Sequence, residues 1–196
     1  AEASNQVAVD LIHGVLRRMG VDEQAVVLLP ATHEATAEML NAVGYIDLCI
    51  PRGGRKLIDF VRDTARIPVI ETGAGVVNTY FDETGDLEKG KAIVLNAKTR
   101  RVSVCNALDC LLVHVARLAD LPALVEPLAG KNVVLYADSA AYGQLEGRYP
   151  SSLLCEADAE SFGREYMDYK MSVRVVRDID EAVDHIARYG SGHSEA

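Results

Sequence analysis

The chain has 196 residues, of which 49% are hydrophobic, enough to bury a sizeable core as one domain or as parts of two. Its 20 lysines and arginines against 29 aspartates and glutamates give a net charge of −9, which opposes nonspecific binding to nucleic acid or to an anionic membrane surface. No apolar run approaches the roughly 20 residues that cross a bilayer. Four scattered cysteines without a Cys-x-x-Cys pair indicate reduced thiols and no metal site, and we expect a cytoplasmic protein.

The first part of the chain alternates between helical and strand patterns. Helices are predicted over 4–19, 31–44 and 55–65. Each is followed by a short apolar run that is typical of a buried strand, at 25–29, 45–50 and 67–71. This order indicates parallel strands joined by crossover helices, in an α/β sheet covered on both faces.

From about residue 75 the alternation continues with a different spacing. Strands are predicted at 76–82, 111–115, 132–138 and 171–176. Helices are predicted at 86–98, 121–129 and 178–190, and the stretch 138–165 is expected to be polar and irregular. The last helix has complete signals, because Asp178 is an N-cap residue, Glu181 follows three residues later and Gly190 ends the helix.

Two predicted strand ends run directly into glycine-containing turns, after Ile50 and after Ile70. Ligands of parallel α/β sheets gather at such ends, where glycine lets backbone N–H groups approach and a helix N-terminus favours an anion. The first turn, PRGGRK, adds cations to its glycines and favours a phosphate or carboxylate ligand. A simple connection before a helix also explains it, and it matches neither Gly-x-Gly-x-x-Gly nor the P-loop pattern.

Glu71 lies where an apolar strand ends, a place where a carboxylate is costly unless it has a partner or a task. Cys105 follows a run of cations that ends at Arg101. Nearby cations, or a helix N-terminus directly after the cysteine, would favour the nucleophilic thiolate. Free cysteine is also a common core residue, so both interpretations stay open for Cys105. Cys110 opens an apolar run and is better explained as core.

Four segments, IPRGG, PVIETGAG, DLEKGKAIVLNAKTRRVSVCNALDCLLVH and YMDYKMSVRVVRDIDEAVDHIARYGSGHSEA, resemble the gamma-glutamyl phosphate reductase (glutamate-5-semialdehyde dehydrogenase) family of the aldehyde dehydrogenase superfamily. The similarity runs over essentially the whole chain in one register. It implies an aldehyde dehydrogenase-like α/β fold, in which part of a Rossmann-type nucleotide-binding domain is followed by an α/β catalytic domain. Residues 1–74 would be the C-terminal part of the NADP-binding domain and 75–196 an incomplete catalytic domain.

The resemblance also implies roles for individual residues. The cysteine of SVCNA is the family's nucleophile, which falls on Cys105, and Glu71 takes the place of the superfamily's general-base glutamate. The cofactor is expected beside the PRGG turn and the glutamate of REYMD, which are Arg52, Gly53, Gly54 and Glu165. Candidates for contact with the substrate's phosphate or carboxylate are Lys98, Arg101 and His193. A solvated helix end explains the arginine equally well, and an ordinary surface histidine is the alternative for His193.

The implied reaction is the NADPH-dependent reduction of L-glutamyl 5-phosphate to glutamate 5-semialdehyde with release of phosphate, the second step of proline biosynthesis from glutamate. The implied partners are this small molecule and further copies of the enzyme in a homo-oligomer. Relatives continue beyond both ends of the sequence, so we expect an internal piece that is inactive by itself. The alternative is a catalytically silent module for folding or assembly.

The sequence departs from the family at Val77 and Asn78, where a Cys-His pair is common, and at Val102, where proline is usual.

Overall fold

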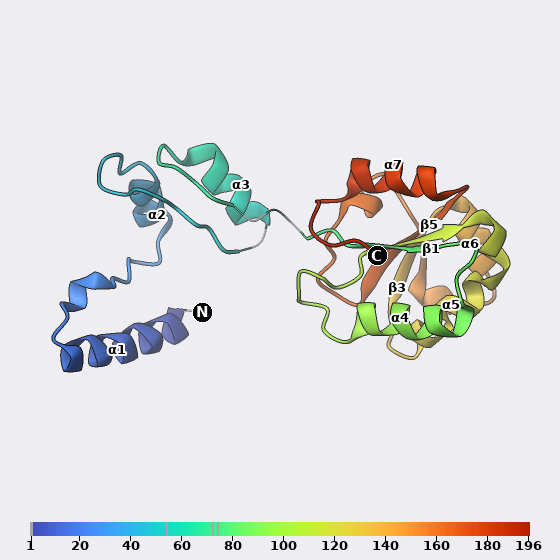
Figure 1. Ribbon diagram of the computed structural model, residues 1–196, viewed down its shortest axis with the longest axis horizontal. Helices are drawn as coiled ribbons and strands as arrows, with labels where there is room; N and C mark the ends of the chain where they lie inside the picture. The colour runs from blue at the N-terminus through green and yellow to red at the C-terminus, as the bar shows by residue number, and fades with distance from the viewer. Residues whose placement is uncertain (1, 54, 72, 74) are drawn as a thin grey trace. The chain divides into compact units, whose positions relative to one another are not determined.

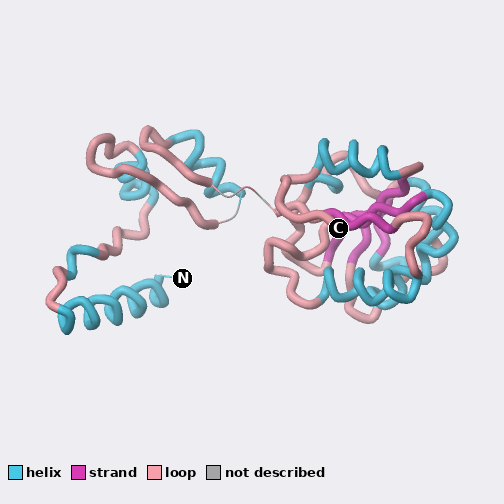
Figure 2. Tube along the Cα trace, viewed as in Figure 1, coloured by secondary structure: helices cyan, strands magenta, loops and turns pink. Residues whose placement is uncertain are grey.

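The computed structural model describes residues 2–53, 55–71, 73 and 75–196. The chain divides into two compact units, Ala1–Thr72 and Gly73–Ala196, called unit 1 and unit 2 below. Figure 1 labels the α-helices and some of the strands, and Figure 2 marks helices and strands by colour. The division falls close to the domain boundary that we expect at residue 74. The roles of nucleotide-binding and catalytic domain stay predictions for these units.

Unit 1 contains the three predicted helices, α1 (Glu2–Met19), α2 (His33–Leu40) and α3 (Arg55–Thr64), and a short 3₁₀ helix, η1 (Glu23–Ala25). The N-terminus of α2 is capped by Thr32, whose hydroxyl accepts the Ala35 N–H at 3.1 Å. The positions of all three helices were predictable because their apolar residues recur at helical spacing and polar residues flank them.

The strands predicted for unit 1 are the main error of the sequence analysis. The run at 25–29 forms no strand, and its Val27 and Leu29 side chains are 58% and 48% exposed. The runs at 45–50 and 67–71 meet in a single parallel bridge between Cys49 and Val69. A strand is stable only when neighbours take up its backbone hydrogen bonds, and the described part of unit 1 supplies one such pairing.

Unit 2 is built on a five-stranded sheet whose strand pairs are all parallel. The strand order is β1-β2-β5-β3-β4, and Figure 2 shows the strands side by side in magenta. Their bounds are β1 (Asn78–Phe81), β2 (Cys110–His114), β3 (Val134–Ala137), β4 (Leu154–Glu156) and β5 (Lys170–Val176). The last strand therefore inserts between β2 and β3, and β1, β2 and β5 are neighbours although they are far apart in the sequence.

Helices cover both faces of this sheet, with α7 on one face and α4 and α5 on the other (Figure 1). The helices are α4 (Leu87–Thr99), α5 (Leu121–Ala129), α6 (Ser139–Leu145) and α7 (Ile179–Tyr189), with 3₁₀ helices η2 (Val115–Asp120), η3 (Ser151–Leu153) and η4 (Ser161–Gly163). Alternate residues of β2 serve the two faces: Leu111 and Val113 belong to the large core with α4 and α5, whereas Cys110 and Leu112 pack with Ala182 of α7.

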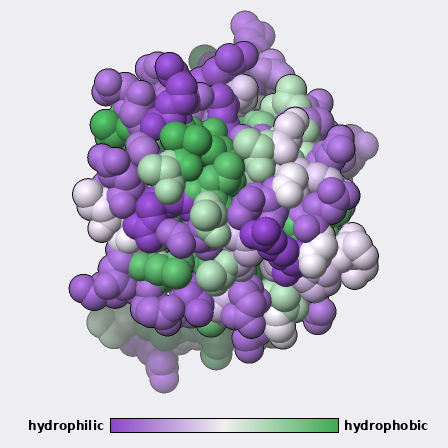
Figure 3. Space-filling view, turned by 90° about the vertical axis from the view of Figure 1, so that its right-hand side faces the viewer, coloured by the Kyte–Doolittle hydropathy of each residue, from purple (hydrophilic) through white to green (hydrophobic). Residues whose placement is uncertain are grey.

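The outer surface of unit 2 fits a covered sheet. The face that Figure 3 turns to the viewer is mostly hydrophilic, with small hydrophobic groups between the polar residues. The four strands predicted for this half are present, and so are the three predicted helices. The short helix α6, the strand β4 and the 3₁₀ helices η3 and η4 were missed in the stretch 138–165, because elements of three to seven residues are too short to show a periodic pattern.

Candidate active site

Three of the predicted site segments in unit 2 lie where strands begin. Gly75 precedes β1, Cys105 precedes β2 and Glu165 precedes β5. These three strands are parallel neighbours, so their amino ends lie at one edge of the sheet. Ligands of open α/β sheets usually bind at the opposite edge, where the strands end. The sheet thus collects these residues at the edge that the general rule does not favour.

Cys105 lies in a surface loop between α4 and β2, and its side chain is exposed. The loop contains a turn in which the Ala107 N–H donates to the Val104 carbonyl at 3.0 Å, and it is tied to α4 by the Leu108 N–H, which donates to the Ala97 carbonyl at 3.1 Å. The suggested helix N-terminus after the cysteine is wrong, because the chain passes from this turn directly into β2. An accessible thiol on a loop with fixed ends is suited to attack a substrate carbon.

Gly75 and His193 approach this loop from distant parts of the sequence. A Cβ atom on Gly75 would lie 2.5 Å from the Cys105 carbonyl oxygen, 3.2 Å from the Cys105 Cβ and 2.9 Å from the His193 Cδ2. Only glycine therefore allows the chain at position 75 to lie this close to Cys105 and to the His193 ring. Cys105 and His193 are both exposed, so the fold brings two chemically active side chains to one face around a glycine.

The segment after α7 holds His193 in place. It returns to β1, where Glu195 forms a parallel bridge with Asn78. The Val76 N–H donates to the Ser191 hydroxyl at 2.9 Å, and the Asn78 N–H donates to Glu195 Oε2 at 2.9 Å. These bonds lie on both sides of His193 along the chain, so the histidine is fixed opposite the start of β1.

Lys98 does not meet the role expected for it as a substrate contact. The side chain lies at the end of α4 and is 0% exposed. Its ammonium donates to the Leu108 carbonyl at 2.9 Å and lies 3.9 Å from Asp109 Oδ1. Burial lowers the pKa of Lys98 to about 8 and raises that of Asp109 to about 6. An enclosed ammonium cannot reach a dissolved phosphate, so the expectation for Lys98 is wrong. Of the two basic residues expected to contact the substrate, Arg101 is the exposed one.

Glu165 is half-buried in the segment before β5. Its neighbour Tyr166 is held in place, since the Tyr166 N–H donates to Asp109 Oδ1 at 3.0 Å, the Tyr166 hydroxyl donates to the Ser161 carbonyl at 3.0 Å, and its ring stacks on Tyr136 with centroids 5.6 Å apart. The backbone beside Glu165, the residue predicted to bind a cofactor ribose, is therefore fixed by the contacts of Tyr166. Nothing in the sequence pointed to Tyr166, because an aromatic residue beside a polar turn carries no specific signal.

The remaining candidates belong to unit 1. Glu71 is 3.6 Å from the Arg62 guanidinium of α3 and partly exposed. Arg52 and Gly53 are exposed in the turn before α3, and a Cβ on Gly53 would come within 2.5 Å of Leu57. Gly54 lies outside the described residues. These positions are compatible with the predicted roles and do not test them.

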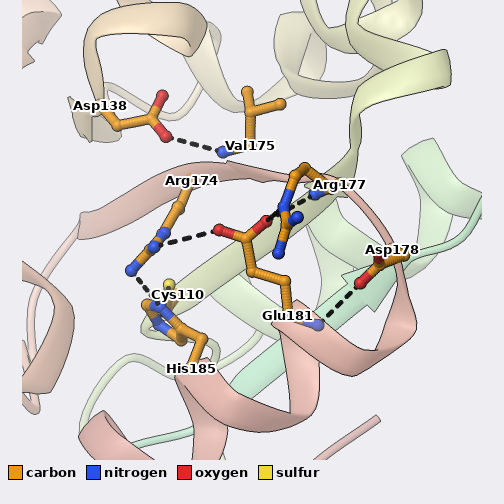
Figure 4. Close-up of polar contacts among 8 residues, drawn as sticks. All are labelled: Cys110, Asp138, Arg174, Val175, Arg177, Asp178, Glu181 and His185. Carbon is orange, nitrogen blue, oxygen red and sulfur yellow. Dashed lines mark hydrogen bonds and ion pairs between the residues drawn. The ribbon is translucent and has the colours of Figure 1, made fainter.

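Cys110 is a core residue, as expected. It is 0% exposed, and burial raises the pKa of its thiol to about 12. Its sulfur lies 3.6 Å from His185 Nε2, and the other ring nitrogen, Nδ1, lies 3.1 Å from an Arg174 guanidinium nitrogen (Figure 4). Because a guanidinium only donates, Nδ1 accepts and the ring proton lies on Nε2, toward the sulfur. This inert thiol contrasts with the exposed one of Cys105.

Figure 4 also shows how Glu181 joins two arginines at the start of α7. Its Oε1 lies 3.4 Å from Arg174, and its Oε2 accepts from the Arg177 N–H and side chain, both at 2.9 Å. A cavity of about 270 Å³ opens beside these groups, and none of the predicted site residues lines it. Arg174 and Arg177 are already paired with the Glu181 carboxylate, so we interpret this cluster as a structural ion network.

Metal and membrane sites can be considered for the described part of the chain. Among those residues, no group of three or more His, Cys, Asp or Glu side chains is arranged to hold a metal ion. None of their helices combines the length and apolar character that crossing a membrane requires.

Known structures define the class of this fold. A propionaldehyde dehydrogenase from Rhodopseudomonas palustris with bound propionyl-CoA matches 81% of the chain and 41% of its own length, with a TM-score of 0.53 and 21% identity. An engineered glycolyl-CoA reductase with bound NADP⁺ matches 81% of the chain and 42% of its own length, with a TM-score of 0.53 and 23% identity. The chain thus has an aldehyde dehydrogenase-like α/β fold, as the sequence predicted.

More similar proteins identify the particular relatives. The gamma-glutamyl phosphate reductase of Pelodictyon phaeoclathratiforme is 61% identical over 193 residues, which are 98% of the chain and 46% of that protein. The crystal structure of gamma-glutamyl phosphate reductase from Thermotoga maritima matches 98% of the chain and 45% of its own length, with a TM-score of 0.86 and 36% identity. No family model matches the sequence. The resemblance to gamma-glutamyl phosphate reductases is confirmed: the chain is homologous to them throughout, and it spans about half the length of the curated relatives it matches.

Proposed function

We propose that this chain supplies the nucleophile of an NADPH-dependent glutamate-5-semialdehyde dehydrogenase (gamma-glutamyl phosphate reductase), which reduces L-glutamyl 5-phosphate and releases phosphate. The observation that carries the proposal is the exposed thiol of Cys105 beside Gly75 and His193, in a chain that is 61% identical to a reductase of that name. The complete reaction is assigned to a protein of the length of these relatives.

The chemistry follows from the residues. The Cys105 thiolate attacks the carbonyl carbon of the acyl phosphate, the C–O bond to phosphate breaks, and a thioester forms on the cysteine. NADPH, when bound, supplies the hydride that reduces this thioester. The resulting hemithioacetal releases the aldehyde as its oxygen loses a proton and the C–S bond breaks, which restores the thiolate. His193, exposed beside the same loop, is suited to contact the departing phosphate.

The other candidates have proposed roles in binding and proton transfer. Arg101 is exposed and can pair with the phosphate or the substrate carboxylate. Reduction of an acyl phosphate needs no activated water, so Glu71 is assigned a role in positioning or in proton transfer. The substrate is a small polar molecule, and further copies of the enzyme in the cytoplasm are the proposed partners.

The residues present fit a nicotinamide cofactor. Arg52 and Gly53 lie shortly before α3, and a glycine-containing turn at a helix N-terminus suits a pyrophosphate or nicotinamide group. Glu165 is half-buried before β5, and a carboxylate there is suited to accept hydrogen bonds from ribose hydroxyls. Arg52 and Gly53 in unit 1, and separately Glu165 in unit 2, are each proposed to contact the cofactor. Its preference for NADP over NAD is taken from the relatives.

The proposal is tested by replacing the cysteine in the enzyme at the full length of its relatives. Cys105→Ala should abolish phosphate-dependent oxidation of the semialdehyde, followed as NADPH formation. Cys155→Ala is the matched control, because Cys155 is also partly accessible but lies on β4. Substantial activity in the Cys105 variant would refute the mechanism. Complete inactivity of the unaltered enzyme with this substrate would favour the alternative hypothesis, in which the chain is a catalytically silent module for folding or assembly.

A further inference from the structure

Asp109 is a carboxylate with an unusual number of structural contacts. It directly precedes β2 and is 2% exposed. Its Oδ1 accepts the Tyr166 N–H at 3.0 Å, and its Oδ2 faces the Val77 N–H at 3.4 Å. Its backbone extends the same connections, since its N–H donates to the Val77 carbonyl and its carbonyl accepts the Ser172 N–H. One residue therefore bonds to the segments that lead into β1 and β5.

These segments carry the proposed site. Val77 follows Gly75, which touches Cys105 and His193, and Tyr166 follows Glu165. The Cys105 loop itself ends at Asp109 and is held by Lys98, whose ammonium binds the Leu108 carbonyl. Asp109 and Lys98 are thus the buried polar centre to which the loop of the nucleophile, the glycine segment and the cofactor segment are all attached.

Resting on the function proposed above, we propose that Asp109 is a positioning residue, which fixes Cys105 and Glu165 relative to each other through its bonds to Val77 and Tyr166. Lys98 is its counterion and holds the intervening loop. The pair acts on the reaction through the backbone, without touching substrate or cofactor.

The alternative is a buried ion pair that serves stability alone, and the two roles differ in one respect. A buried ion pair can often be exchanged for neutral residues of similar shape without loss, because the cost of removing the charges from water disappears with them. Two converging backbone N–H groups, however, need an acceptor on each side. Asparagine offers one oxygen and turns an NH₂ group toward the other N–H.

The decisive variant therefore removes both charges at once. Lys98→Met with Asp109→Asn keeps the volumes and leaves no unpaired buried charge. Measured in this chain by hydrogen exchange, the amide of Tyr166 or Val77 should exchange about tenfold faster or more, because a bond to a charged acceptor is lost. Amides of α5 should be unchanged. Asp109→Asn alone should give the same local effect if it folds. Unaltered exchange at both Tyr166 and Val77 in the double variant would overturn the proposal, whatever the activity of the enzyme.

Asp138 provides a matched control. Its carboxylate also accepts two backbone amides, Ala141 at 2.8 Å and Val175 at 2.9 Å, but it follows the end of β3, at the opposite edge of the sheet. Figure 4 shows its bond to Val175. Asp138→Asn should increase exchange at these two amides and leave those of Tyr166 and Val77 unchanged.

A second measurement separates positioning from stability in the enzyme at the full length of its relatives. The double variant, Lys98→Met with Asp109→Asn, should bind NADPH with a Kd that is several-fold higher. A fluorescence titration measures this Kd without any turnover. The increase should disappear when Glu165→Gln is already present, because Asp109 acts through Glu165. Equal increases with and without Glu165→Gln would overturn the link to Glu165. Inactivity toward glutamyl phosphate with this coupling intact would refute the proposed substrate only.

Discussion

Gly75 shows at the scale of a single residue how closely the site is packed. The position of its missing side chain lies against the Cys105 carbonyl and the His193 ring. The carbonyl belongs to the backbone of a loop tied to α4, so Gly75→Ala must displace either that loop or the strand entry. We expect a loss of about 1–3 kcal/mol in the free energy of unfolding, measured with urea. In the full-length enzyme, kcat should fall by roughly 10- to 100-fold as Cys105 moves.

The matched control is Gly143→Ala in α6. No atom lies within 4 Å of the added Cβ, and alanine is the better helix former by roughly 0.5–1 kcal/mol. This variant should be as stable as the unaltered protein or more so, with unchanged kcat. Similar behaviour of the two alanine variants would show that the contacts at Gly75 are not restrictive.

His185 gives unit 2 a pH dependence that can be measured. Burial, followed by the charge of Arg174, lowers its pKa from 6.5 to about 4, and Glu181 opposes this weakly. The unfolded chain therefore binds a proton that the folded chain does not between pH 6.5 and 4, so stability is complete above 6.5 and falls as the pH falls through this window. The loss amounts to at most about 3 kcal/mol.

Asp109 has the opposite effect on the pH dependence of stability. Its raised pKa of about 6 makes the folded form more stable as the pH falls below 6. The contribution of His185 is therefore isolated by comparison with His185→Phe, a ring that can still pack on Phe162 and Tyr189. Urea unfolding between pH 4 and 7 should show a weaker acid destabilisation in this variant. Parallel curves for both proteins would contradict the assignment.

The sequence revealed the residues of the site unevenly. Cys105 was proposed because its motif is specific, and Glu165 and His193 were proposed through the same register, so their roles stay predictions. Asp109 was not among the candidates, and Lys98 was expected to contact the substrate's phosphate or carboxylate, whereas it is buried. A single charged residue carries no mark of burial in the sequence, because the partners that make burial tolerable, Val77 and Tyr166, lie 32 and 57 positions away.

At the scale of elements, α7 has the complete start and stop signals that the sequence indicated, and its cap can be tested. Asp178 accepts the Glu181 N–H at 2.9 Å, as the capping pattern predicts. Asp178→Ala should lower the free energy of unfolding of unit 2 by about 1 kcal/mol. Asp184→Ala removes an exposed carboxylate from the same helix. It should change the free energy of unfolding by less than about 0.5 kcal/mol. Equal effects would indicate that the cap contributes nothing particular.

Strands were predicted less evenly than helices. In unit 2, apolar runs became strands because each found neighbours in the sheet. In unit 1, similar runs formed one bridge, and the apolar side chains of Val27, Leu29 and Ile70 remain exposed. A helix closes its hydrogen bonds within its own segment, whereas a strand depends on residues that its sequence does not contain.

At the scale of the whole molecule, the two units should differ in stability. Residues 73–196 contain a continuous core between sheet and helices, so as a separate polypeptide they should unfold in urea in a single cooperative transition. Residues 1–72 bury few apolar side chains, chiefly Leu40, Ile58, Val61 and Ile67, and should lack a sharp transition and bind a hydrophobic dye. A broad transition of 73–196 would contradict this division of stability.

The sequence by itself determined the α/β class, the helices, the parallel strands of unit 2 and the similarity to the reductases, because periodic burial and specific motifs are local properties. The role of Cys105 as nucleophile stays a prediction from the same motif. Only the tertiary structure decided which strands exist in unit 1, that Lys98 is buried, and that Gly75, Cys105 and His193 meet at the amino ends of the strands. Those outcomes depend on the strand order and on contacts between distant segments, since β5 inserts beside β2 and the last residues return to β1. The site arises where these long-range pairings bring separate segments to one edge of the sheet.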